Sequence, residues 1–312
     1  MKAAKLLFTA ISAALIAPLA HAGSVNTDEF TVYKPSGKGF GVVDKEASDH
    51  ARKNGMAQTR TTRGTGISYH GGPVMVAATT KLYYIWYGNW SSYTKAQQIL
   101  TAFGSGIGGT GAYNVNTTYY NGSNQHVVNN VQLAGQYSDN YSQGSSLSDQ
   151  GVLNVVTAAI NAGAFPNDPN ALYFVLTSPD VNETSGFGSQ YCGWHTNAKI
   201  GANDIKYSFV GNPLTIAPSG CGVSNPSPNG DGGADAMASV MYHELSEAVS
   251  DPDGNAWYDS TGQENGDKCA WNFGTTFTTS NGAKANQTFA SRNWLLQQMW
   301  LNAGSGSCVQ KY

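Results

Sequence analysis

The stretch ALYFVLTS, residues 171–178, gives the first indication of the fold, because almost every residue in it is apolar or β-branched. A strand with one face in water alternates apolar and polar residues, whereas a continuous apolar run is typical of a strand that is buried on both faces. Such burial requires other structure on each side of the sheet. The stretch therefore predicts an interior strand of a layered fold.

Extended and helical patterns alternate along the chain before this strand. Residues 73–90, PVMVAATTKLYYIWYGNW, predict one long strand or a pair of strands, and residues 94–104 place their apolar side chains on one helical face. The Asn-Gly pair at 121–122 predicts a β-hairpin within residues 112–135. Residues 148–163 predict a second helix, with the serine at its start as the N-cap.

The alternation of strands and helices continues after residues 171–178. Residues 205–212, IKYSFVGN, predict a further strand, and a Pro/Gly/Asn loop then leads into a helix capped by Asp231 or Asp235. We expect this helix, at about 234–250, to pack on the sheet and to end at Asp251-Pro252. Mixed strands and helices without a linker predict one domain, α/β or α+β in class, with a mixed β-sheet flanked by helices.

The amino-terminal segment has the pattern of a secretory signal peptide. Residues 1–22 contain two lysines, an apolar run and an Ala-His-Ala cleavage site, so we expect cleavage near Ala22 and a secreted, extracellular or periplasmic protein. Residues 23–70 are polar and predict an irregular N-terminal arm, which leaves 71–312 as the domain. No later segment approaches about 18 continuous apolar residues, so no membrane span is expected.

Composition narrows the class of partner. The net charge is -3 and only 12% of the residues are charged, so nucleic acid is not an expected partner. The chain is rich in glycine, with 37, and has 17 tyrosines and 7 tryptophans. Such a composition is consistent with an exported protein that acts on an extracellular peptide or a cell-wall polymer.

Four cysteines in an exported chain predict two disulfides. Three pairings exist, one of which joins neighbours, Cys192 with Cys221 and Cys269 with Cys308. Each would close a loop of roughly 30 to 40 residues and contribute about 3 to 4 kcal/mol in the chain-entropy model. No two cysteines are close in sequence, which disfavours a zinc ribbon.

The candidate site is the segment HELSE, residues 243–247. On a helix, His243 and Glu247 lie one turn apart on the same face, and both residue types bind Zn²⁺. Glu244 is then the expected general base, as in H-E-x-x-H hydrolases. Glu247 stands where that motif has its second histidine, and its negative charge favours harder cations. An ordinary helix is the alternative, because His/Glu pairs at this spacing also form plain hydrogen bonds.

Four downstream acids compete to be the third ligand. Asp253 has the offset of the third ligand in metzincins, whereas Glu264 and Asp267, in QENGDKC, belong to a later segment that could return to the helix. Asp251 precedes a proline and predicts a helix-ending turn. Together with Asp259, these acids also offer oxygen ligands for Ca²⁺, without the spacing of an EF-hand loop.

One further histidine lies close to a cysteine. His195, in YCGWHT, could be an accessory ligand or an oxyanion partner near the helix, but we favour a structural histidine held by the disulfide loop of Cys192. No G-x-S-x-G elbow accompanies it, so a serine triad is not expected.

Several motifs together resemble one known family. GGPVM, YYIWYGNW, ALYFVLTSPDV, GFGSQYCGWH, KYSFVGNP and HELSEAVSDPDGNAWYD with ENGDKCAW are similar to the Exordium or phosphate-induced protein 1 family, from about Gly71 to Cys308. The resemblance implies secretion to the cell wall or exterior, and no established reaction. It also implies Glu264 or Asp267 as the third ligand, since the family has an H-E-x-x-E helix and a later E-x-x-D-x-C segment.

Two functions follow as hypotheses. The first is a secreted, zincin-like metallohydrolase with Glu244 as its base. The second is a non-catalytic extracellular or wall-associated binding or signalling protein, with a structural metal site or none, whose tyrosines and tryptophans bind a polymer.

Overall fold

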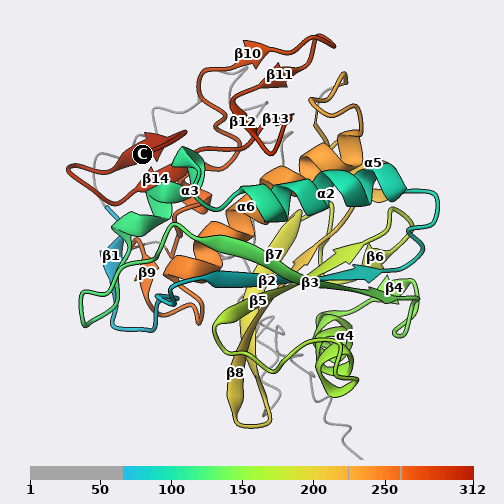
Figure 1. Cartoon of the computed structure of the whole chain (residues 1–312), viewed down its shortest axis with the longest axis horizontal. Helices are drawn as coiled ribbons and strands as arrows, with labels where there is room; N and C mark the ends of the chain where they lie inside the picture. The colour runs from blue at the N-terminus through green and yellow to red at the C-terminus, as the bar shows by residue number, and fades with distance from the viewer. Residues whose placement is uncertain (1–65, 224, 261) are drawn as a thin grey trace, which may run out of the picture.

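The computed structural model describes residues 66–312 except 224 and 261 (Figure 1). The predicted signal peptide, and residues 23–65 of the predicted arm, lie outside the described residues. Residues 66–70 belong to the fold, since β1 (Ser68–Tyr69) pairs with β9 (Trp257–Tyr258). The described part is a mixed α and β structure built on one main sheet, which confirms the predicted fold class.

The central sheet has five strands, in the order β3-β2-β5-β8-β7. Neighbours run parallel except β7, which lies at one edge and runs antiparallel to β8. All seven residues of β5 are buried, so the apolar run lies at the centre of the sheet as predicted. The bounds are β2 (Thr80–Tyr87), β3 (Val131–Asp139), β5 (Ala171–Thr177), β7 (Gly193–Ile200) and β8 (Asn203–Val210).

Three long helices cover both faces of this sheet: α2 (Thr94–Gly106), α4 (Asp149–Asn161) and α6 (Gly232–Ser250). The connection through α2 leads from β2 to β3, and the one through α4 leads back across the sheet to β5. Right-handed crossovers in opposite directions place their helices on opposite faces. Figure 1 shows α2 and α6 on one side of the sheet and α4 on the other.

Local sequence signals set the ends of these helices. The hydroxyl of Ser148 accepts a hydrogen bond from Gly151 N, and the carboxylate of Asp231 accepts one from Ala234 N, so both predicted N-caps are confirmed. Helix α6 ends at Asp251, as expected before a proline. Every residue of α6 from 233 to 250 is buried, because the helix packs against β7, β8 and α2. Its polar side chains are therefore buried too.

The predicted hairpin at 121–122 is wrong. The turn does form, with Asn121 N donating to Gln125 O, but only a single bridge joins Tyr120 to His126. The residues before it form the short helix α3 (Gly111–Asn114) and a 3₁₀ helix, and the alternating residues after it belong to β3. The partner of β3 is β2, brought alongside by α2, so the alternation came from a non-local pairing.

Short elements complete the structure, and two disulfides cross-link it. The disulfides join Cys192 to Cys221 and Cys269 to Cys308, which confirms that there are two and selects the pairing of neighbours from the three possible. The short strands pair as β4 (Ser146–Leu147) with β6 (Asn182–Glu183), β10 (Phe277–Thr278) with β11 (Lys284–Ala285), β12 (Gln287–Phe289) with β13 (Arg292–Trp294), and β14 (Met299–Leu301) with β15 (Ser307–Val309). The remaining helical turns are α5 (Pro213–Ile216), Val115–Thr118 and Asp267–Cys269.

Candidate metal centre

The second half of α6 carries three of the predicted site residues. His243, Glu244 and Glu247 are all 0% exposed. The helical spacing brings His243 Nε2 to 2.9 Å from Glu247 Oε1, although neither ring nitrogen of His243 has a hydrogen bond within the described part of the chain. Two ligands of one ion lie close together in this way without a hydrogen bond between them.

Strand β7 brings His195 against this face of α6. Its Nδ1 lies 3.3 Å from Glu244 Oε2 and 3.6 Å from Glu247 Oε2, and its Nε2 lies 3.4 Å from Asp251 O. The side chain is 4% exposed. The sequence favoured a structural role for His195 over an accessory one, and the structure places it within the cluster. The disulfide of Cys192 cross-links the chain three residues earlier.

A loop at 264–267 closes the cluster from a third direction. Glu264 Oε1 lies 3.7 Å from His195 Nε2, and Asp267 Oδ1 lies 3.6 Å from His243 Nε2. The backbone N–H of Asp267 donates to Glu247 Oε1 at 3.0 Å. Both acids that the family resemblance favoured therefore return to α6.

Neighbouring polar contacts fix this loop in place. The side chain of Asn265 donates to Ser246 O, and that of Gln297 donates to Gly266 O. A Cβ at Gly266 would lie 2.8 Å from His243 Nδ1 and 2.9 Å from Glu247 Oε1, so the close approach requires glycine. The second disulfide, at Cys269, follows two residues after Asp267.

Two overlapping sets of ligand atoms result. One ligand atom each from His195, Glu247 and Glu264 lie within 4.8 Å of one another, and so do those of His243, Glu244 and Glu247. Four ligands at about 2.0–2.1 Å from Zn²⁺ in a tetrahedron are about 3.3 Å apart. The distances of 2.9–3.7 Å between the cluster's nitrogen and oxygen atoms match that spacing.

Several buried polar atoms in the cluster have no hydrogen-bond partner in the described part of the chain. Within residues 66–312, apart from 224 and 261, no hydrogen bond reaches either ring nitrogen of His243, Glu244 Oε1, Glu247 Oε2 or Glu264 Oε1. A buried polar atom without a partner costs about 1–3 kcal/mol, and such atoms often mark a bound ion or water. A cation among them would satisfy several at once.

The pKa values of three of the cluster's acids and of His243 are raised, which indicates an excess of negative charge in the cluster. Burial raises the pKa of Glu244 and of Asp267 to about 7, and raises that of Glu264 well above its ordinary value. Burial lowers the pKa of His243, but the charges of Glu247 and Glu244 outweigh it and leave the pKa at about 10. Protons are thus held where a divalent cation would otherwise balance the carboxylates.

The other predicted acids have different surroundings. Asp253, the metzincin-type candidate, pairs with Lys206 Nζ at 3.0 Å, and Asp259 pairs with Lys268 Nζ at 2.9 Å. The carboxylate of Asp251 accepts a hydrogen bond from Ala256 N. Of the described residues, none of these three belongs to the converging sets.

The cluster is almost closed to solvent. Asp267 is its most exposed side chain, at 16%.

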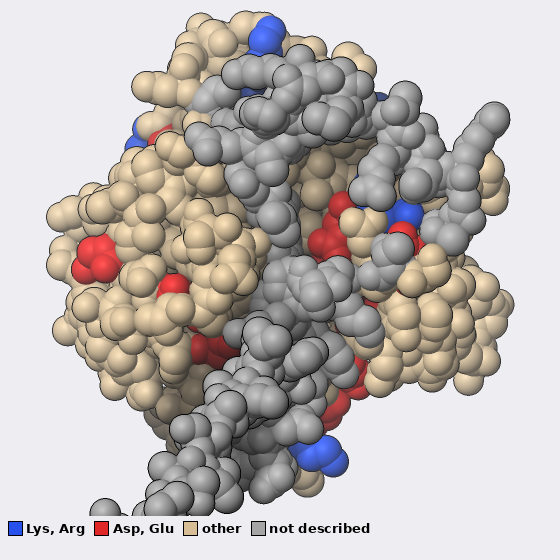
Figure 2. Space-filling model, turned by 180° about the vertical axis from the view of Figure 1, so that it is seen from behind, with Lys and Arg blue, Asp and Glu red and all other residues tan. Residues whose placement is uncertain are grey.

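Figure 2 shows acidic side chains at several places on one face of the molecule, where basic side chains are few. No helix within the described ranges is long and apolar enough to cross a membrane.

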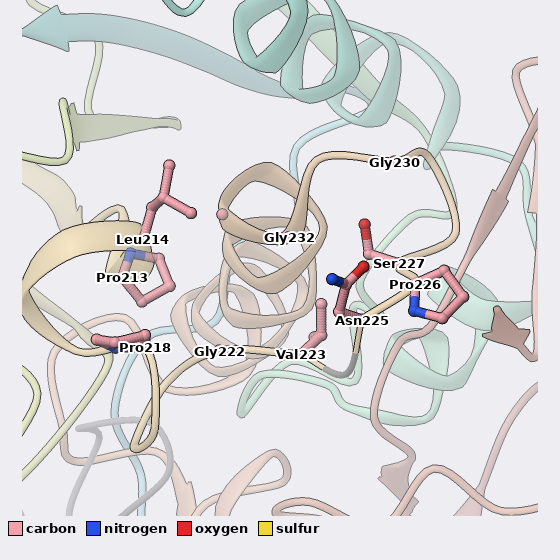
Figure 3. A pocket seen from close by; sticks show the side chains of 11 residues that line it. Pro213, Leu214, Pro218, Gly222, Val223, Asn225, Pro226, Ser227, Gly230 and Gly232 are labelled. Atoms are coloured by element: carbon pink, nitrogen blue, oxygen red, sulfur yellow. The ribbon is translucent and has the colours of Figure 1, made fainter.

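A separate cavity of about 290 Å³ lies at the other end of α6 (Figure 3). Its walls are largely apolar and include Pro213, Leu214, Pro226 and the first residues of the helix, Gly232 and Gly233. None of the converging ligands lines it.

Comparisons with known proteins agree with these motifs. The profile of the phosphate-induced protein 1 conserved region matches residues 67–310. Protein EXORDIUM-like 5 of Arabidopsis thaliana is 33% identical over 239 residues, covering 67% of this chain and 65% of the relative. Protein EXORDIUM-like 3 of the same plant is 29% identical over 273 residues, covering 75% of this chain and 80% of the relative. No solved structure matches the chain. The chain therefore belongs to the Exordium, or phosphate-induced protein 1, family.

Proposed function

We propose that the protein is a secreted metallohydrolase that cleaves extracellular peptides with the aid of a divalent cation, Zn²⁺ in the first instance. One observation carries the proposal: buried ligand atoms from α6, β7 and the 264–267 loop converge without enough hydrogen-bond partners among the described residues. Structural hydrogen bonding alone would leave those atoms unsatisfied, whereas a cation balances both their charge and their geometry.

The residues present fit a cation of this kind. His243, Glu247 and Asp267 would hold it from one side of the cluster, and His195 and Glu264 from the other. The bound ion would supply Lewis acidity to a hydrolytic reaction. Ca²⁺, which takes only oxygen ligands in numbers of about six to eight, suits two histidines less well.

Glu244 is the residue proposed for proton transfer. Its Oε2 lies 3.3 Å from His195 Nδ1, while Oε1 has no hydrogen-bond partner among the described residues. A carboxylate with an unengaged oxygen can accept a proton from an attacking water and return it to the leaving amine.

Secretion is part of the proposal. Two disulfides, the absence of a membrane-spanning helix in the described residues and membership of the Exordium family support it. The predicted signal peptide can be tested by sequencing the mature amino terminus, which should begin at Gly23.

The decisive experiment combines metal analysis with casein hydrolysis. Purified wild-type protein should carry stoichiometric metal, and Glu244→Gln should retain that metal while losing activity by about 10²–10⁴-fold, the range for a general base. Asp235→Asn, a buried acid on the same helix but outside the cluster, is the matched control and should retain both. Wild-type protein without metal would overturn the hydrolase. Metal without casein cleavage, or unchanged activity in Glu244→Gln, would favour the non-catalytic alternative with a structural metal.

A further inference from the structure

We infer that the cluster binds two divalent cations and that Glu247 bridges them through its two carboxylate oxygens. The first cation would be held by His243, Glu247 Oε1 and Asp267, and the second by His195, Glu247 Oε2 and Glu264. The inference rests on the metal site of the proposed function and specifies its nuclearity and the role of Glu247.

The two oxygens of Glu247 face different histidines. Oε1 lies 2.9 Å from His243 Nε2, and Oε2 lies 3.6 Å from His195 Nδ1. Both converging sets of ligands include Glu247, and it is the only residue that they share. Asp267 lies outside both sets and is assigned to the first ion by its distance of 3.6 Å from His243 Nε2. A single residue shared by two sets of ligands is the arrangement of a bridge.

This geometry explains why the helix carries glutamate where H-E-x-x-H helices carry a second histidine. A neutral histidine has one unprotonated ring nitrogen and so binds one ion, whereas a carboxylate has two oxygens and can bind one ion with each. The change from histidine to glutamate is therefore the change that a second ion requires.

The charge of the cluster supports the same number of ions. Glu244, Glu247, Glu264 and Asp267 bring four negative charges when ionised, and the two histidines are neutral when they act as ligands. Asp251, which is buried and acts electrostatically on Glu264, adds a fifth negative charge. One divalent cation therefore leaves a net charge of -3 in the interior and two leave -1, so the second ion is favoured.

Nearby basic residues do not supply this compensation. Within the described ranges, the recorded ion-pair partners of the four acids are His195 and His243 only. The lysine beside the loop, Lys268, pairs with Asp259, and Lys206 pairs with Asp204 and Asp253.

Two ions would extend the chemistry of the site. Paired metal sites, with ions about 3.5–4 Å apart, stabilise both the attacking and the leaving groups of a hydrolysis. Glu244 belongs to one converging set and also contacts His195 of the other, so it is placed to serve the space between the two ions.

The test is the number of ions per chain, with Mn²⁺ as the probe. The full chain, stripped with a chelator and dialysed against Mn²⁺, should bind two ions by elemental analysis and should give an exchange-coupled electron paramagnetic resonance spectrum. His195→Ala should retain one ion and give the six-line spectrum of isolated Mn²⁺. Glu247→His, which restores the H-E-x-x-H pattern, should also retain one. Asp235→Asn should bind two, and circular dichroism should report the fold of each variant.

The possible outcomes separate this inference from the proposed function. A single ion in the wild type overturns the bridge and leaves the metallohydrolase standing, whereas no ion overturns both. Two uncoupled ions, or two ions retained by folded His195→Ala, would also refute the bridge. Two coupled ions together with full activity of Glu244→Gln would support the bridge and refute the catalytic role.

Discussion

Removal of bound metal should destabilise the folded chain by an amount that the structure allows us to estimate. Three of the atoms that would bind metal, His243 Nε2, Glu247 Oε2 and Glu264 Oε1, are buried and have no hydrogen-bond partner within the described residues. At about 1–3 kcal/mol for each such atom, the total is about 3–9 kcal/mol if nothing relaxes. Protonation of the carboxyl groups and local movement relieve part of this cost, so we expect a loss near the lower end, about 3 kcal/mol.

Calorimetry can measure this loss. For a domain of this size, each kcal/mol corresponds to about 2–4 °C in Tm, so treatment with a chelator should lower Tm by about 6–12 °C. The disulfides remain oxidised throughout, and returning Zn²⁺ should restore the original Tm. The double variant His243→Ala with Glu247→Ala is the control, because its Tm should not respond to the chelator. A wild-type protein that has lost its metal by elemental analysis but melts within about 2 °C of the loaded form would refute the reasoning.

Three further predictions concern single residues or pairs. Burial raises the pKa of Glu183 to about 7, so the folded state holds this proton more tightly than the unfolded state does. The free energy of unfolding should therefore fall by up to about 3 kcal/mol as the pH rises from about 4.5 to 7. Glu183→Gln should remove this slope of unfolding free energy against pH, as measured by urea unfolding. An unchanged slope would contradict this. Gly266→Ala, which crowds His243, should weaken Zn²⁺ binding at least about ten-fold in competition with a chelator. Gly232→Ala, with open space around it, should leave the affinity unchanged. Equal Zn²⁺ affinities of the two variants would argue against a requirement for glycine at 266. Replacing Cys192 and Cys221 by serine should lower the free energy of unfolding by about 3–4 kcal/mol, and a loss below about 1 kcal/mol would be inconsistent with the loop-closure model.

The parts of the fold that could be predicted were those with local causes. The uninterrupted apolar run of β5 reflects burial on both faces, and Ser148 and Asp231 cap their helices through bonds only three residues long. The hairpin at Asn121 failed because its alternating residues pair with β2, which a local pattern does not reveal. A turn forms at Asn121, but its positive φ lies at Asn124 rather than at Gly122, and the strand partner was non-local.

The candidate site also has parts that a local pattern predicts and parts that it does not. Helical spacing alone places His243 and Glu247 together. The part played by His195 could not be read locally, because this histidine lies 49 residues from Glu244 and reaches it only through the register of β7 against β8. Spacing also left Asp253 as a candidate ligand, and only the buried Lys206 shows why its carboxylate is engaged elsewhere.

The disulfides connect these long-range contributions to the site. Outside α6, the candidate ligands come from two segments, and each is cross-linked close to its ligand: Cys192 lies three residues before His195, and Cys269 lies two residues after Asp267. A ligand on an untethered segment would have to be ordered each time an ion binds, at a cost of about 1–2 kcal/mol per residue of backbone. Cross-links at these positions confine both segments beside α6 before any ion arrives. In this family member, the covalent framework therefore favours a preorganised metal site, and reduction of either disulfide should weaken metal binding before it unfolds the central sheet.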